Sequence, residues 1–384
     1  MGTRALLVST TTRWLGPARM PRALAKVGFD VLLLTPAGSL AEHSRYVARI
    51  EHLPDSATTA QWASVFAATV AATSPRIVLP CDDMAFRLLQ MTVLLPPPAN
   101  IPPVLHLQAS ALVRDSLGDP AHYRSSVDKT LLPPAAEALG VRVPPHTIIA
   151  DAQGAHAFAA AHGYPVVLKR SHGSAGEGVA ICKNSAELAA AVQRLLRQSA
   201  IDVEWESHGR VLAQAHIPGG ITYYNVAAWR GDVLAGYASD KLVAYPEPMG
   251  PSSVMRYHRS PEIRDFAQKL TEGFGISGML NLECIVDRRS REPYLLEINR
   301  RFSPGAYRGA MLNVDMCAAL HAALHGVPSP SRADLDEGEQ GVRVNFPYEW
   351  LRDPHSRWLR EYPVDVPWDE PELIAAMLAM RHDR

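Results

Sequence analysis

Two apolar segments late in the chain carry the residues best suited to chemistry. Side chains of a strand alternate between its two faces, so Glu297, Asn299 and Arg301 share one face of the second segment. If the polar stretch between the segments turns the chain, an antiparallel hairpin places Glu283 opposite Glu297. Facing carboxylates repel unless a cation lies between them, and oxygen ligands from Glu283, Glu297 and Asn299 suit Mg²⁺. The alternative is a solvated strand face on which Arg301 forms a salt bridge.

A glycine-rich loop at residues 171–178 separates two further apolar segments. Small residues let backbone amides approach an anion closely and form an anion-binding concavity. Lys169 ends the segment before the loop. Most of the 38 basic residues are arginines, so a compact ammonium at this position favours a phosphate site. The absence of a following G-K-[ST] excludes a Walker A motif, and a flexible hairpin tip is the alternative interpretation.

Composition narrows the possible partners. The 384 residues have a formal net charge of −1 and 20% charged residues, which is typical of a globular protein of two or three domains. A net charge this close to zero does not indicate a basic surface that binds nucleic acid or an anionic membrane. No apolar run reaches the ~18–20 residues that span a bilayer, and the N-terminal one is too short for a signal peptide. Four widely spaced cysteines are expected to be buried thiols, and a cytoplasmic protein is expected.

Strand and helix patterns alternate over roughly the first 110 residues. Apolar strands are predicted at residues 4–9, 29–34 and 76–80, with helices between them, which favours an open parallel α/β sheet. The first helix is expected to begin near Pro21 and to end before Gly28. No G-x-G-x-x-G follows the first strand, so a dinucleotide fingerprint is absent.

The rest of the chain mixes strands and helices in another order. A strand–loop–strand hairpin at residues 164–182 precedes a helix for which Ser185 is the predicted N-cap. Asp369 and Glu372 are the predicted capping residues of a last helix that begins at Pro371. The other predicted elements are strands at 210–217, 222–229, 279–287, 293–301 and 342–346, and a helix at 261–274.

Taken in order, these stretches resemble the ATP-grasp superfamily over roughly residues 110–310. The most specific part of this resemblance is the E-x-N-x-R pattern formed by Glu297, Asn299 and Arg301. The next most specific part is the lysine followed by the glycine loop. The family is of the carboxylate–amine or carboxylate–thiol ligase type, with an ATP-grasp domain like that of carbamoyl-phosphate synthase. The matching stretches are VDKTLLPPAAEALGVRVPPH, YPVVLKRSHGSAGEGVAIC, VLAQAHIPGG, GMLNLECIVD and LLEINRRFSPGA.

The resemblance implies an α/β and α+β fold, in which an open parallel α/β domain precedes a two-lobed ATP-grasp fold. The implied domains are an N-terminal α/β domain at 1–110, a small lobe with the glycine-rich lid at 111–209, a large lobe with the metal site at 210–330, and a C-terminal extension packing on the core at 331–384.

The resemblance also implies a role for individual residues. Phosphates of ATP are held by lysines and covered by the glycine loop, and the backbone of the segment between the two lobes binds adenine. The metal is Mg²⁺, as two ions, with Mn²⁺ as an alternative. Lys241 approaches the γ-phosphate or the substrate, and Arg301 stabilises the acyl phosphate or its oxyanion. The implied nucleotide-binding residues are Lys129, Lys169, Ser171, Gly173, Ser174, Gly176, Gly178, Gln214, Ala215 and Ile217, and the implied metal ligands are Glu283, Glu297 and Asn299.

Some positions depart from the family pattern. Gln214 stands where the family usually has Glu, although its carbonyl can still accept from the adenine amino group. The acid that commonly holds the ribose is absent, and Thr222 is the nearest residue. Pro133 and Pro134 follow Lys129 closely, and they fit a helix there only if they lie in its first turn.

The function implied is an ADP-forming ligase that joins a carboxylate to an amine through an acyl phosphate. Its partners would be small-molecule carboxylates and amines, without nucleic acid or membrane, and a homodimer is a candidate assembly. Two alternatives stay open, namely a phosphotransferase that acts on a hydroxyl group and a nucleotide-binding protein without turnover.

Several other residues have two interpretations. Asp82 and Asp83 follow a predicted strand. They either cap the next helix, or they contact the substrate or another domain. The loop at residues 9–14 lies at the same sheet edge and is a candidate for substrate contact. His321 and His325 lack the Glu of H-E-x-x-H, so a helix edge is expected rather than zinc. Three aromatic residues are expected to pack in the core rather than stack on a base, namely Tyr223, Tyr224 and Trp229.

Overall fold

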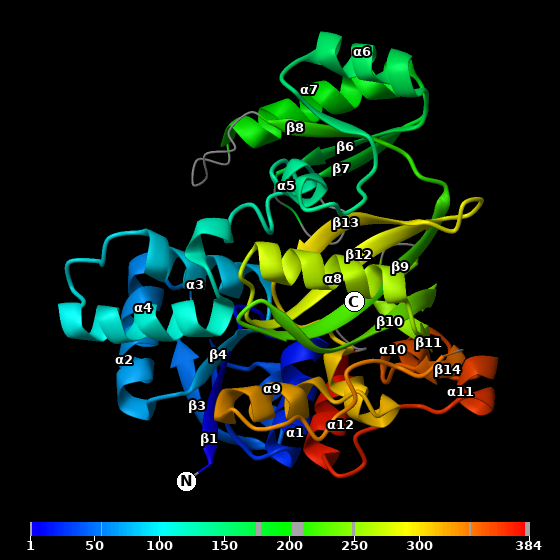
Figure 1. The fold of residues 1–384 in the computed structure, drawn as a ribbon. Helices are drawn as coiled ribbons and strands as arrows, with labels where there is room; N and C mark the ends of the chain where they lie inside the picture. Colours follow the sequence, from blue (N-terminus) through cyan, green and yellow to red (C-terminus); the bar gives the residue numbers. More distant parts are fainter. Residues whose placement is uncertain are drawn as a thin grey trace.

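The computed structural model describes residues 2–54, 56–171, 173, 178–201, 210–247, 250–337 and 339–380. These residues form three sheets (Figure 1). A parallel sheet lies in the N-terminal part, and two antiparallel sheets follow it in the chain. Figure 1 shows the four-stranded antiparallel sheet at the top, the six-stranded one in the middle, and the N-terminal sheet below it beside the C-terminal helices.

The N-terminal unit, β1–β4 with α1–α4, has the predicted parallel sheet in the order β3-β2-β1-β4. Alternate side chains of β1 and β2 are buried on opposite faces, because helices cover both sides. The α2, α3 and α4 helices cover one face, and α1 and α9 cover the other. The bounds are β1 Thr3–Val8, α1 Leu15–Lys26, β2 Phe29–Pro36, β3 Val47–Leu53, α2 Thr59–Thr73, β4 Ile77–Pro80, α3 Asp83–Leu94 and α4 Pro103–Leu117.

The first helix differs from its prediction. It begins at Leu15, and Pro21 lies inside it rather than near its start. Proline removes a helical hydrogen bond. Leu15, Ala18 and Leu24 are nevertheless all buried against the sheet, and this packing holds the helix through the proline.

The small lobe consists of β5–β8 with α6 and α7, and its antiparallel sheet has the order β5-β8-β6-β7. The predicted hairpin is confirmed, because β6 pairs with β7 antiparallel on either side of the glycine loop. The N-cap of α7 is Asn184 rather than Ser185, since Asn184 Oδ1 accepts from the Glu187 amide at 3.0 Å. The bounds are β5 His146–Ile149, α6 Ala152–His162, β6 Val166–Arg170, β7 Val179–Cys182, α7 Ser185–Ile201 and β8 Val211–Ala215.

The large sheet is antiparallel, with the strand order β13-β12-β9-β10-β11-β14. One face packs against α8 (Pro261–Gly273), whose apolar residues Ile263, Phe266, Ala267 and Leu270 are all buried there. The opposite face joins the core shared with α1 and α9 (Met316–His325). The strand bounds are β9 Gly219–Trp229, β10 Asp232–Ala244, β11 Ser252–His258, β12 Gly278–Asp287, β13 Pro293–Asn299 and β14 Glu339–Val344.

The last helix, α12 (Pro371–Ala379), lies beside the N-terminal unit (Figure 1). The predicted cap is wrong, because Glu370 precedes the helix and makes no side-chain capping bond. Asp369 instead accepts from Arg22 Nε at 2.9 Å and from Tyr46 Oη at 2.6 Å. These bonds tie the C-terminal segment to the N-terminal unit. The remaining helices are η1 Leu40–His43, η2 Pro120–His122, α5 Leu132–Ala138, η3 Ala306–Leu312, α10 Tyr348–Arg352 and α11 Arg357–Glu361.

The cysteines have the buried positions that the sequence predicts. All four cysteines are buried and free. Over the part of the chain that the structure describes, no group of three or more His, Cys, Asp or Glu could hold a metal ion. His321 and His325 lie on α9 with their ring centroids 4.3 Å apart. None of the described helices is long and apolar enough to cross a membrane.

Candidate active site

The β12–β13 hairpin has the register predicted from the alternation of its side chains. Glu283 lies directly opposite Glu297, and Asn281 lies opposite Asn299. The neighbouring strand β9 places Tyr223 opposite Glu283 on the other side. Because partners in adjacent strands share a face, two carboxylates, two carboxamides and a phenol gather on one patch of the large sheet.

The two carboxylates have opposite pKa shifts. Burial, and then the charge of Glu297, raises the pKa of Glu283 above its ordinary value. Burial acts in the same direction on Glu297, but the charges of Lys129 and Lys169 outweigh it and lower the pKa of Glu297. A raised carboxyl pKa indicates a buried charge with too little positive charge around it. The hairpin therefore has the electrostatics and the oxygen donors that suit an added hard cation.

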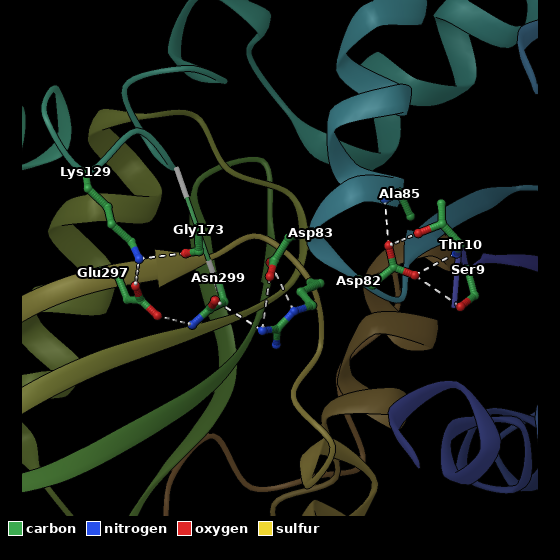
Figure 2. A network of polar contacts seen from close by, with 10 residues as sticks. Ser9, Thr10, Asp82, Asp83, Ala85, Lys129, Gly173, Glu297 and Asn299 are labelled. Atoms are coloured by element: carbon green, nitrogen blue, oxygen red, sulfur yellow. Dashed lines mark hydrogen bonds and ion pairs between the residues drawn. The ribbon is translucent and has the colours of Figure 1, made fainter. Parts of the chain in front are cut away.

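Two lysines reach this patch from different directions. Lys129 Nζ lies 3.1 Å from Glu297 Oε2 and donates to the carbonyl oxygen of Gly173 at 2.7 Å (Figure 2). Lys169, near the end of β6, is only 9% exposed, and burial lowers its pKa to about 8 while Glu297 opposes the shift. The backbone amide of Lys129 also donates to the Ser171 carbonyl at 2.9 Å.

The glycine loop is thus connected to the acidic hairpin through Lys129. Ser171, Gly173 and Gly178 are placed by the structure, and Gly178 has a left-handed φ of 73° that favours glycine. Ser174 and Gly176 lie outside the described residues. The prolines after Lys129 are accommodated as expected, because α5 begins at Leu132 and has proline in its first turn.

The segment that leads from the small lobe to the large sheet carries Gln214. Its side chain is 2% exposed, and its Nε2 is buried without a hydrogen-bond partner. A buried amide nitrogen without a partner is costly, so this position suits a ligand with a hydrogen-bond acceptor. Ala215 and Ile217 follow it toward β9. Thr222 is buried and donates to Asp240 Oδ1 at 2.6 Å, so its hydroxyl proton is already engaged.

Arg301 connects the large sheet to the N-terminal unit. Its Nε lies 3.1 Å from Asp83 Oδ1, and its Nη2 donates to Asn299 Oδ1 at 3.3 Å. Asp82, by contrast, caps α3, because its Oδ1 accepts from the Ala85 amide at 2.8 Å (Figure 2). Each of the two interpretations of this acidic pair therefore applies to one of its residues. Asp82 is the helix cap, and Asp83 is a contact between two units of the fold.

Lys241 comes from β10 on the same face. Its Nζ donates to the Gly250 carbonyl at 3.1 Å and lies 5.7 Å from the centre of the Tyr223 ring. Burial lowers the pKa of Lys241, and Glu283 opposes that shift. A lysine with a lowered pKa, close to the carboxylate of Glu283, is suited to contact a charged substrate.

Some of these groups line a cavity of about 630 Å³, whereas Lys129, Lys169, Gln214 and the described residues of the glycine loop are not part of its lining. Its walls include Lys241, Glu283, Glu297 and Arg301 from the large sheet and the following loop. They also include Thr10, Thr11, Arg13 and Trp14 from the loop at residues 9–14, a candidate for substrate contact. Tyr223 lines the cavity and also packs against the shared core, as expected, and Tyr224 is fully buried.

The C-terminal part of the chain supplies wall residues that no sequence pattern indicated. Asn345 and Tyr348 follow β14 and line the same cavity. A hydrogen bond fixes the side chain of Asn345, because its Nδ2 donates to the Ser252 carbonyl at 2.5 Å. Neither residue belongs to a motif, and only the pairing of β14 with β11 brings them to the site.

Comparison with known proteins agrees with this geometry. The family model of the carbamoyl-phosphate synthase L chain ATP-binding domain matches residues 128–207. The arginine-specific carbamoyl phosphate synthase large chain of Geobacillus stearothermophilus is 25% identical over 199 residues, which are 48% of this chain and 18% of that relative. The chain thus spans about a fifth of the length of this curated relative.

Two solved structures share the fold over most of the chain. The biotin carboxylase domain dimer of Hydrogenobacter thermophilus 2-oxoglutarate carboxylase, solved with MgADP, ADP and bicarbonate, has a TM-score of 0.64 and 18% identity, covering 86% of this chain and 72% of that one. The L-amino acid ligase from Bacillus licheniformis has a TM-score of 0.57 and 14% identity, covering 84% and 74%.

The family match covers Lys129, Lys169 and the glycine loop, and the structural matches extend to the large sheet and its acidic hairpin. Sequence pattern, fold and site geometry therefore agree. The chain has the ATP-grasp fold, and its residues 128–207 match the ATP-binding domain of the carbamoyl-phosphate synthase L chain.

Proposed function

We propose that this chain is an ATP-dependent, ADP-forming ligase that joins a carboxylate to an amine through an acyl phosphate. The observation that supports it most is the pairing of Glu283 with Glu297 on one face, beside Asn299 and Arg301, in a cavity that extends to the N-terminal unit. The cavity contains the metal-site residues and leaves room for other substrates. The nucleotide-binding candidates border it through the contact of Lys129 with Glu297. The L-amino acid ligase among the structural matches supports the same reaction class.

The metal would be held by residues in the wall of the cavity, and the nucleotide by residues beside it. Lys129 and Lys169 would contact phosphate oxygens together with the glycine loop from Ser171 to Gly178, including Gly173, Ser174 and Gly176. The backbone from Gln214 through Ala215 to Ile217 would contact adenine. Glu283, Glu297 and Asn299 would hold Mg²⁺, as two ions or with Mn²⁺ in its place, and the metal would neutralise charge on the phosphates.

The residues of the chain then have distinct tasks in each step. An oxygen of the substrate carboxylate attacks the γ-phosphorus, and the bond between that phosphorus and the bridging oxygen breaks to release ADP. Lys241, which lies on β10, contacts the charged groups of the incoming substrates. The amine next attacks the acyl carbon, and phosphate leaves. Arg301 presents a fork of donors to the oxyanion that forms at this carbon, and Asp83 fixes the orientation of that fork.

Hydroxylamine provides a test that does not require the natural amine. An acyl phosphate reacts with hydroxylamine to give a hydroxamate and phosphate. The protein is incubated with MgATP, hydroxylamine and a panel of carboxylic acids, and ADP and hydroxamate are measured. We expect equal amounts of both with the accepted acids, and neither with Glu297→Gln. A phosphoester with ADP would identify a phosphotransferase instead, and a failure to form ADP would identify a binding protein.

Further parts of the proposal concern organisation. The domain boundaries near residues 110, 209 and 330 are proposed from the motifs. We also propose a cytoplasmic location, small-molecule substrates and a homodimer as the candidate assembly. Light scattering on the purified chain measures the assembly directly, and a monomer over the tested concentrations would exclude the dimer.

A further inference from the structure

A second cavity, of about 410 Å³, lies in the N-terminal unit. It is located beyond the carboxyl ends of the parallel strands, because its lining includes Pro36 at the end of β2 and Leu53 at the end of β3. Open α/β sheets bind their ligands at this edge. Among the residues that the structure describes, none of those implied by the ATP-grasp motifs lines this cavity.

The described lining of the second cavity is mostly apolar. Trp62 from α2 contributes a side chain that is 3% exposed, and Leu88 and Met91 line it from α3. Arg87 is the one charged side chain among the lining residues that the structure describes. Such a cavity suits an apolar group rather than a phosphate or a metal ion.

Thr10 and Met84 line both cavities and therefore form the wall between them. Thr10 is fixed, because its amide donates to Asp82 Oδ2 at 2.7 Å and its hydroxyl to Asp82 Oδ1 at 2.8 Å (Figure 2). Met84 is a large apolar side chain that is 49% exposed. The unbranched thioether of methionine adopts many shapes, so Met84 is the part of the wall that can move.

We propose that the carboxylate substrate carries an apolar tail, and that this tail passes Met84 and occupies the second cavity. The inference rests on the proposed function, which places the substrate carboxylate at Arg301. From there the path is short, because Arg301 Nε lies 3.1 Å from Asp83 Oδ1, and Met84 is the next residue. The route explains why an exposed methionine stands between two cavities at the substrate side of the site.

The proposal predicts a graded preference for chain length. Burial of each methylene contributes ~0.8 kcal/mol, which corresponds to about a fourfold gain in kcat/KM per added methylene. We expect this gain along the straight-chain acids until the second cavity is full. An acid too short to reach past Met84 gains nothing from the cavity.

The experiment compares a filled cavity with a matched control. Ala57→Trp places a large side chain at a position that lines the second cavity, whereas Ala60→Trp places it at an exposed position of α2 that lines neither. Met84→Ala widens the wall and alters only a half-exposed side chain. Straight-chain acids from acetate to octanoate are tested with MgATP and hydroxylamine, and their binding is measured separately by calorimetry.

The expected result is a chain-length dependence in the parent, in Ala60→Trp and in Met84→Ala that disappears in Ala57→Trp, while the parent, Ala60→Trp and Ala57→Trp handle acetate alike. Equal kcat/KM for every acid in the parent would overturn the proposal. So would a length dependence that Ala57→Trp leaves intact. If octanoate binds through the second cavity but no hydroxamate forms with any acid, the tail site stands and the ligase function fails.

Discussion

The ammonium group of Lys129 lies 3.1 Å from Oε2 of Glu297. The same group donates to the Gly173 carbonyl at 2.7 Å, so one cation connects the acidic hairpin of the large sheet to the glycine loop of the small lobe. Lys129 thereby supplies part of the positive charge that the partly buried Glu297 requires. This contact explains why the pKa of Glu297 is lowered while that of its partner Glu283 is raised.

The first prediction concerns this lysine. Lys129→Met retains an unbranched side chain but removes the charge that would contact phosphate. We expect MgADP to bind about 10- to 100-fold more weakly, which is the range of a hydrogen bond to a charged group. Calorimetric titration measures the change. Lys183→Met, at an exposed position after β7, is the control and should bind as the parent does, whereas parent-like affinity in Lys129→Met would remove it from the nucleotide site.

The second prediction concerns the metal ligands. Glu297→Gln and Asn299→Ala should each abolish phosphate release, because charge and ligand geometry determine the binding of Mg²⁺. Glu292→Gln is the matched control, since Glu292 precedes β13 on the same hairpin and pairs with Arg142. Circular dichroism should show the parent fold in all three variants. Normal phosphate release from either ligand variant at ordinary Mg²⁺ would exclude this metal site.

The acidic hairpin could be predicted from sequence because its geometry is local. A period of two and a short turn determine which side chains of residues 279–301 share a face, and the observed register is the expected one. The contact of Arg301 with Asp83 could not be predicted in the same way. These residues are 218 positions apart, and only the packing of the N-terminal unit against the large sheet brings them together.

Helix ends were the least predictable local features, for a physical reason. Ser185 and Asn184 are both good capping residues in adjacent positions, and the structure uses the asparagine. Asp369 has the right type for a cap, but it lies one residue before the N-cap position, and Arg22 and Tyr46 bind it. A side chain with several possible partners is assigned by tertiary contacts, which the sequence alone does not show.

The third prediction concerns Lys169. Its side chain is buried among carboxylates at the end of β6, and burial lowers its pKa to about 8. A guanidinium is broader and planar and fits that space badly. Lys169→Arg should therefore weaken MgADP binding by about 1–3 kcal/mol, although the charge is kept. Lys183→Arg is the control, and equal affinities in the two variants would show that Lys169 has a structural role.

The last prediction concerns pH and lies outside the active site. His258 Nε2 is 3.1 Å from Asp240 Oδ1, and this hydrogen bond raises the pKa of His258 above its ordinary value although burial opposes it. The folded state thus favours the charged imidazole. The resulting stability is fully present below the unfolded pKa of about 6.5 and is lost as pH rises through the folded pKa.

His258→Gln should therefore lower the free energy of unfolding by about 0.5–1 kcal/mol at about pH 5.5 and by less at about pH 9. Urea unfolding at both pH values measures the difference between the variant and the parent. His355→Gln, at an exposed position, controls for the loss of an imidazole and should show the same small effect at both. A His258→Gln effect that does not change with pH would mean that the charged pair with Asp240 contributes nothing to stability, because only the charge of the imidazole changes over this range.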